Sequence, residues 1–474
     1  MFRRQPSGHN ASNELDCGTA APVHFERQIR GGSRIVPNAI RYISPDRHPK
    51  SSGWVRRHTN IELDRTAWQY STPMDLDITS DPSNGQSSPV YGTAALVTNR
   101  LDAKVFAFYV KQAGPWLDIA SSDRHFGELV PKLALVTPVL FYACLAYSSR
   151  VLVLMKELDR SEGDRYHDQA ITTLIPLLSA ESVARKNEAL LATAVILRMS
   201  EQFYEVQNDM QCHLLGATSL FAGSNRWSLE QPSLEVASFW VYIRQNIRMC
   251  FLNEQPCQFD LDTSALSMSY SPAPETVWAN RITFLTALIC NECWKDPIGP
   301  GVTTCRKKSW GNYDHLQSSI ERWRQSLPDS FQPWCHIQDE FEPFPVVRYV
   351  SVWQAIAWQY YYVCKVMLAL YGRGQSACTS LLEINQYMES QVLTPARLVC
   401  GITFSCDDVG AVINGSHLAA WCGQLFSGKE EQRCLFNFLQ NFMHQTKWPN
   451  GTCCDRLQRI WTGPNQPWIV RSAT

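Results

Sequence analysis

The sequence predicts an all-α fold, and two observations carry that prediction. Apolar residues recur at helical spacing over long segments from Leu101 onward. Alternating strand patterns are scarce, and Asn450-Gly451 lies between two apparent helices, not between two apparent strands. With 474 residues, 45% of them hydrophobic and 11% aromatic, the chain can bury a large core. No repeat recurs at a fixed period, so a regular solenoid is not indicated.

The first hundred residues differ in composition from the rest. They are rich in Ser, Pro, Asn, Gly and Arg, and stretches such as STPMDLDITSDPSNGQSSPVYG have no apolar period. We expect residues 1–97 to be mostly disordered and residues 98–474 to form the helical domain. Residues 1–66 carry 11 Lys and Arg against 6 Asp and Glu, and the remainder carries 32 against 38. The basic segment can attract a polyanion, although an ordinary solvated tail has the same composition.

The first helix is expected to begin near Leu101 and to end at Gly114-Pro115, because a helix does not easily continue through proline. The polar residues from Asp118 to His125 then supply caps for the next segment. Later segments have apolar faces too wide for solvent, and they predict helices over 189–206, 232–253, 279–294, 349–372 and 433–446.

One apolar run approaches the length needed to span a membrane. It extends from Leu133 to Ser149, but it contains Pro138 and is closed by Arg150. We predict a buried helix with Thr137 as its N-cap and no membrane partner. The cysteine count is 17, an odd number in a large chain that starts without an apolar leader, which favours reduced thiols in the cytosol or nucleus.

Several short motifs have the composition of catalytic or metal sites. Asp123-Arg124-His125 and the run from Asp164 to His167 consist of neighbours that point in different directions, which favours capping and local ion pairing. The pair Cys290 and Cys293 lies inside an apolar helix without a second pair, which favours buried thiols over a redox or zinc site. Gly372-Arg373-Gly374 follows a helix, where a dinucleotide motif needs a strand. We therefore expect no catalytic, cofactor-binding or metal-binding residues, and no enzyme.

The sequence resembles the fungal-specific transcription factor domain, in the branch of the cutinase-regulator-like six-cysteine zinc-cluster proteins. The resemblance lies in FYVKQAGPWLDIASSDRHFGELVPKLALVTPVLFYACLAYSS, then DRYHDQAITTLIPLLS, ALLATAVILR, HLLGATSLF and ASFWVYIRQNIRMCFLNEQP. It covers about Leu101 to Trp461. It implies an all-α regulatory region without catalytic residues, in a nuclear regulator of RNA polymerase II genes. It also implies structural signature residues at the junction of the first two helices: Gly114, Pro115, Trp116, Asp123, Arg124, His125 and Phe126.

The resemblance also implies how such proteins bind DNA. Members of the branch use an N-terminal cluster of six cysteines and two zinc ions, whereas this sequence has only Cys17 before Leu101, too few ligands for one zinc site. We expect no zinc in this chain unless a cysteine cluster lies upstream of Met1, so either the gene model lacks an exon or the protein has lost its DNA reader. FERQIRGGSRIVPNAIRY and SSGWVRRHTNIELDRTA are similar to the basic segment that comes after the cluster. Their arginines are expected to contact DNA phosphates without sequence specificity: Arg27, Arg30, Arg34, Arg41, Arg56 and Arg57.

Three functions remain open from the sequence. The first is a transcription regulator controlled by a small-molecule effector, self-association or a co-regulator. The second is a finger-less interaction protein that heterodimerises with a full-length relative and sequesters it. The third is a terpene-cyclase-like enzyme, for which the acidic run at 260–264 is a poor magnesium site. The aromatic segment 349–371 could line an effector pocket, although such stripes more often form core.

Overall fold

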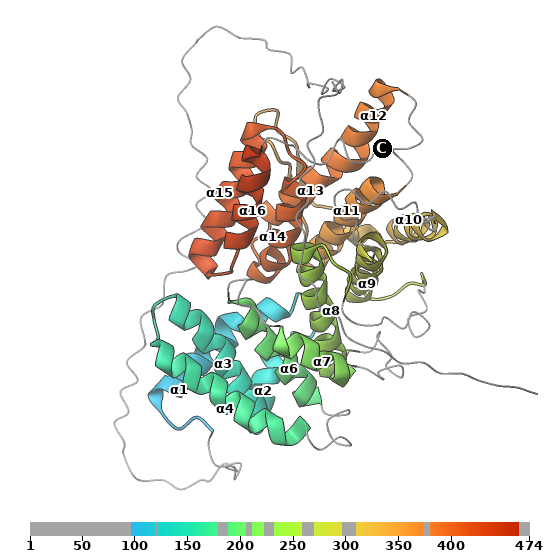
Figure 1. The fold of residues 1–474 in the computed structure, drawn as a ribbon. Coiled ribbons are helices and arrows are strands. Elements are labelled where there is room, and N and C mark those ends of the chain that lie inside the picture. Colours follow the sequence, from blue (N-terminus) through green and yellow to red (C-terminus); the bar gives the residue numbers. More distant parts are fainter. Residues whose placement is uncertain are drawn as a thin grey trace, which may run out of the picture. The chain divides into compact units, whose positions relative to one another are not determined.

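Helices make up nearly all the regular structure in the computed structural model, which describes residues 96–119, 121–178, 188–204, 211–221, 232–257, 270–295, 310–372 and 380–463 (Figure 1). The predicted all-α fold class is confirmed. Cys17, the six N-terminal arginines and the acidic run at 260–264 lie outside the described residues.

The first half of the described chain is helical throughout. Its elements are α1 (Arg100–Phe108), the π-helix η2 (Tyr109–Ala113), the 3-10 turn η3 (Pro115–Leu117), the π-helix η4 (His125–Leu129), α2 (Val130–Ala134), α3 (Pro138–Leu154), α4 (Arg160–Leu178), α6 (Glu188–Gln202), α7 (Cys212–Phe221) and α8 (Leu234–Asn253). Helix α3 packs against α4 and α6, and α6 packs against α7 and α8 (Figure 1).

The second half adds a small hairpin to its helices. Its elements are α9 (Glu275–Trp294), α10 (Trp310–Gln325), the 3-10 turn η6 (Asp329–Phe331), β1 (Cys335–Ile337), β2 (Val346–Arg348), α11 (Val352–Tyr371), α12 (Leu381–Tyr387), the π-helix η8 (Met388–Leu393), α13 (Thr394–Phe404), α14 (Val409–Gly423), α15 (Lys429–Thr446) and α16 (Gly451–Thr462). Helix α14 is central, because it contacts α8, α11, α13, α15 and α16. Figure 1 shows α15 and α16 side by side against it.

The predicted helices are confirmed, with shifted ends. The segment 349–372 corresponds to α11, where Ser351 forms a capping box with Gln354. The segments 279–294 and 433–446 correspond to α9 and α15, but both helices begin four residues earlier, at Glu275 and Lys429. The first turn of α15, Lys429 to Gln432, is polar, so apolar periodicity does not reveal it. Carboxylates in the first turns of both helices, such as Glu275, suit the positive end of the helix dipole.

The apolar run 133–149 contains the predicted buried helix, α3, which begins at Pro138 after Thr137 as the sequence predicts. The run is divided between α2, which ends at Ala134, and α3, which begins at Pro138. Leu135 and Val136 lie exposed in the turn between them. Thr137 does occupy the N-cap position, but its side chain makes no capping hydrogen bond. No helix in the described ranges is long and apolar enough to cross a bilayer.

The antiparallel hairpin of β1 and β2 was not predicted. It pairs Cys335 with Arg348 and Ile337 with Val346, and the Val347 amide donates to the Ser405 hydroxyl at 3.1 Å. Each strand has only three residues. So short a strand leaves no alternating pattern to detect.

Candidate functional site

A cavity of about 50 Å³ lies between η3, α6, α8, α14 and the turn that precedes α16. Its wall is apolar on one part and polar on the other. The lining residues are Trp116, Leu117, Ile119, Met199, Gln202, Val241, Arg244, Gln245, Arg248, Gly410, Ile413, Asn414, His417 and Trp448. They come from five separate stretches of sequence, so only the folded chain forms this site.

Two arginines of α8 supply positive charge to the cavity wall. Arg244 is 8% exposed, and its Nη1 has no hydrogen-bond partner among the described residues. Burial lowers the Arg244 pKa to about 10, partly opposed by Tyr360 and Asp118, so the guanidinium stays charged at neutral pH. The guanidinium carbon of Arg248 lies 4.7 Å from the centre of the Trp448 ring, in a cation–π contact.

Asp118 is the carboxylate that acts electrostatically on Arg244, but its oxygens are already engaged. Oδ1 accepts from the Phe126 amide at 2.8 Å, and Oδ2 accepts from the Gly127 amide at 2.6 Å. Burial raises the Asp118 pKa to about 6, against the lowering effect of those two amides. No ion pair joins Asp118 to Arg244 in the part of the chain that is described.

His417 on α14 faces the same cavity as a neutral imidazole. It is 4% exposed, and burial together with the Arg248 charge lowers its pKa to about 3. The Ile413 carbonyl lies close to the ring, but neither ring nitrogen forms a well-aligned hydrogen bond within the described ranges. A neutral imidazole carries one N–H, so His417 is an unused donor.

Asn414 connects the cavity to α11 through a buried hydrogen-bond network. The Tyr360 hydroxyl donates to Asn414 Oδ1 at 2.7 Å, and Asn414 Nδ2 donates to Gln359 Oε1 at 3.1 Å. Gln359 Nε2 in turn donates to the Thr403 hydroxyl at 3.2 Å. This network fixes the Asn414 side chain in the wall.

Of the signature residues at 114–116, Trp116 lines the cavity. Helical structure ends at Ala113, and Gly114-Pro115 starts the 3-10 turn η3, as the sequence predicts. A Cβ on Gly114 would lie 2.7 Å from the Phe126 carbonyl oxygen, so a larger residue does not fit there. The turn places Trp116 against the cavity, stacked at 6.3 Å on Phe203.

The other signature residues lie in and around η4 and do not line the cavity. Arg124 has φ 48° and an exposed 3.9 Å ion pair with Glu128, and Asp123 is exposed. His125 is buried and its Nδ1 lies 2.7 Å from the Ser121 hydroxyl, while Phe126 is fully buried. These contacts are local and structural in kind.

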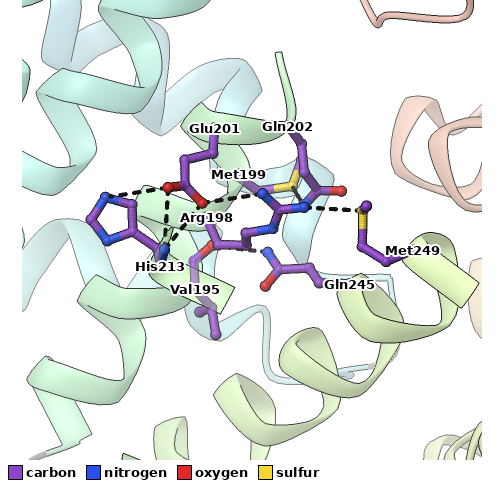
Figure 2. A network of polar contacts seen from close by, with 8 residues as sticks. All are labelled: Val195, Arg198, Met199, Glu201, Gln202, His213, Gln245 and Met249. Atoms are coloured by element: carbon purple, nitrogen blue, oxygen red, sulfur yellow. Dashed lines mark hydrogen bonds and ion pairs between the residues drawn. The ribbon is translucent and has the colours of Figure 1, made fainter. Parts of the chain in front are cut away.

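A second buried polar cluster lies directly beside the cavity, on α6 (Figure 2). Arg198 is 0% exposed and pairs with Glu201, with 3.1 Å between Nη1 and Oε2. Its Nη2 lies 3.2 Å from the Met249 sulfur, and the two Glu201 oxygens accept from the His213 amide at 3.2 Å. Figure 2 also shows Gln245 of the cavity wall, which donates to the Val195 carbonyl at 2.9 Å.

The remaining motifs do not form a site with this cavity. Asp164 pairs with Arg150 and Arg160, and the Tyr166 hydroxyl donates to Asp102 at 2.6 Å. The last residue of that run, His167, has its ring 6.0 Å from that of His213. The Asp164–Arg160 pair lies within α4, and the contacts of Asp164 with Arg150 and of Tyr166 with Asp102 join α4 to α3 and α1.

The cysteine pair and the loop after α11 also stay apart from the cavity. Cys290 and Cys293 are buried in α9, and burial raises the Cys290 pKa to about 12. Gly372 ends α11, and the residues directly after it lie outside the described ranges. Within those ranges, no group of three or more His, Cys, Asp or Glu side chains is arranged to hold a metal ion.

The aromatic helix does not line the cavity. Trp358, Tyr360 and Tyr361 of α11 are buried in the core, where Trp358 packs edge-on at 6.0 Å against Trp323. The effector pocket suggested for 349–371 is therefore not where the cavity lies. Sequence reasoning missed Arg244 and Arg248, although a signal existed: two arginines four residues apart lie on one face of an otherwise apolar helix.

Comparison with known proteins identifies the first part of this structure. Residues 104–234 match the family model of the fungal specific transcription factor domain. The matched segment, which is less than half of the chain, is similar to members of this family. It runs from α1 into the start of α8 and supplies Trp116, Met199 and Gln202 to the cavity. The match supports a role in transcription regulation. No curated protein and no solved structure matches the chain.

Proposed function

We propose that this protein is a nuclear regulator of RNA polymerase II genes that acts through its helical region. The observation that carries the proposal is the match of residues 104–234 to the transcription factor domain. The proposed region extends beyond that match, because the helices continue to Thr462 and α14 contacts α8 as well as α16. We propose that residues 98–474 act as one regulatory domain.

The contact of this chain with DNA is proposed to be non-specific. The basic excess over residues 1–66 supports phosphate contacts, and six arginines are its proposed donors. Base reading needs an element that enters a groove, and Cys17 alone cannot build a zinc-based one. Recruitment to promoters would then depend on a partner, through homo- or heterodimerisation.

The proposal is tested by tethering the whole chain to an unrelated DNA-binding domain that recognises sites upstream of a reporter gene. We expect reporter expression to change at least severalfold relative to the DNA-binding domain alone. Unchanged expression, with the fusion shown to be nuclear and intact, would contradict the proposal. A protein that only sequesters a relative would leave this reporter unchanged and would lower expression from that relative's own promoter.

DNA binding is tested separately by titrating the purified chain onto promoter DNA and scrambled DNA at two salt concentrations, with zinc content assayed. We expect equal affinity for both DNAs, a steep loss of affinity at higher salt, and no zinc. A promoter preference that survives high salt would show that the chain contains a base-reading element.

A further inference from the structure

We propose that the cavity beside α8 binds a short-chain carboxylate, with Arg244 as the residue that pairs with the carboxylate group. Binding rests on the cavity alone. The role of the ligand as a signal that controls the helical region rests on the proposed function.

The first argument is an excess of buried donors. Arg244 Nη1, Trp448 Nε1 and the single N–H of the neutral His417 ring lie at this cavity, buried and without a well-aligned hydrogen-bond partner in the described ranges. Unsatisfied buried polar groups are rare, and each one destabilises the folded chain. Two acceptors, the Gln245 Oε1 and the other ring nitrogen of His417, are also unpartnered there, and bridging water can satisfy them. A ligand rich in acceptors is therefore the best complement.

The second argument is charge. Arg244 and Arg248 both line the cavity, and no carboxylate among the described residues does. Asp118 is the acidic group whose charge raises the pKa of Arg244, and its two oxygens accept hydrogen bonds from backbone amides. A guanidinium binds a carboxylate through two parallel hydrogen bonds, which makes a carboxylate the matching anion.

Size and wall chemistry define the rest of the ligand. A buried water needs about 10–15 Å³ on this scale, so a cavity of about 50 Å³ has room for about four non-hydrogen atoms. Ile119, Val241 and Ile413 also line the cavity and give it apolar surface. Acetate, with four non-hydrogen atoms, fits both requirements, and propionate exceeds that size by one atom, whereas phosphate would leave charged oxygens against that apolar surface.

The position of the cavity gives such a ligand a structural effect. Its wall joins α6, α8 and α14, and Asn414 extends the contact to α11 through Gln359 and Tyr360. An anion held there would connect elements on both sides of the end of the family match at residue 234. It would also offset the cost of the buried Arg244 charge, so binding should raise the stability of the whole domain.

The test is calorimetric titration of the full chain with sodium propionate and sodium acetate, with propionamide and sodium chloride as controls. Propionamide has the same shape as propionate and no charge. A ligand this small is expected to bind with Kd between about 10 μM and 10 mM. We expect heat of binding and a rise in melting temperature with both carboxylates, and neither effect with the controls.

Variants locate the site. Arg244→Met should weaken propionate binding at least about tenfold, and Arg244→Lys should recover part of the affinity, because lysine keeps the charge but not the two-pronged geometry. Arg281→Met is the matched control. Arg281 is equally buried, at 7% exposure, but it lies on α9 over Trp278 and away from the cavity.

Two results would overturn the proposal. One is equal binding of propionamide and propionate, or no binding of either carboxylate at 50 mM, about five times the weakest expected Kd. The other is unchanged propionate affinity in a folded Arg244→Met protein, which would mean an adventitious ion only. Each result leaves the reporter experiment unaffected. Propionate binding with no change in reporter expression would instead contradict the proposed function and leave the site intact.

Discussion

Two arginines on neighbouring helices are buried to nearly the same extent but have different surroundings. Arg198 on α6 is 0% exposed and pairs with Glu201 at 3.1 Å (Figure 2). Arg244 on α8 is 8% exposed and has no ion-pair partner within the described residues. The first arrangement pairs the charge with a counter-ion within the chain. The second leaves its charge facing a cavity that also holds His417 and Trp448.

The difference separates a charge that is paired within the chain from a charge that is available to an anionic ligand. A buried charge with a counter-ion is neutralised within the chain, and removing one partner leaves the other charge without it. A buried charge without a counter-ion destabilises the folded chain. A protein retains such a charge where a bound ligand supplies the counter-ion. This reasoning identifies the Arg244 cavity, and not the Arg198 cluster, as the candidate binding site.

The largest expected effect comes from breaking the complete pair. Glu201→Gln keeps the shape of the side chain but removes the negative charge that lies 3.1 Å from the buried Arg198 guanidinium. We expect a loss of about 3 kcal/mol in unfolding free energy, measured by urea denaturation. Glu128→Gln is the control, since its 3.9 Å pair with Arg124 is exposed and should contribute less than about 1 kcal/mol. Equal losses in both variants would show that Arg198 does not depend on Glu201.

The next effect concerns the wall of the cavity. A Cβ on Gly410 would lie 2.6 Å from the Trp116 carbonyl oxygen, so Gly410→Ala must push α14 away from η3. We expect the unfolding free energy, measured by urea denaturation, to fall by about 2 kcal/mol. Propionate should also bind more weakly. Gly216→Ala is the matched helical control. Its Cβ would meet nothing within 4 Å, so it should gain about 0.5–1 kcal/mol.

A pH titration of stability tests the paired cluster from another direction. Burial, His167 and Arg198 lower the pKa of His213 from 6.5 to about 4. Below pH 6.5 the unfolded chain therefore binds a proton that the folded chain does not, so stability is lost as pH falls toward 4. We expect His213 to account for roughly 1–2 kcal/mol between pH 6.5 and 5. His213→Gln should flatten the profile by that amount, and an unchanged profile would contradict it.

The sequence could predict the helices but not the cavity. Apolar periodicity located α8 and α11 to within three residues at either end, because wide buried faces repeat along one segment. It missed the polar first turn of α15 and the three-residue strands, which have no such period. The cavity draws Trp116, Arg244 and His417 from distant parts of the chain, and no local rule joins them. Only the spacing of Arg244 and Arg248 on an apolar helix indicated buried charge in advance.

The smallest expected effect on stability is the most telling one, because it comes from removing the unpaired charge. Arg244→Met replaces a buried guanidinium with an apolar side chain of similar length and leaves no carboxylate orphaned, since the Asp118 oxygens keep their amides. We expect unfolding free energy without ligand to stay within about 1 kcal/mol of the original protein, or to rise. Arg198→Met removes the counter-ion of Glu201. Its unfolding free energy should fall by about 3 kcal/mol in the same urea experiment. If both variants lose the same unfolding free energy, Arg244 has a partner inside the chain. The distinction between the two arginines would then be wrong. If only Arg198→Met loses stability, Arg244 is retained for something other than folding, which is the condition that a binding residue must meet.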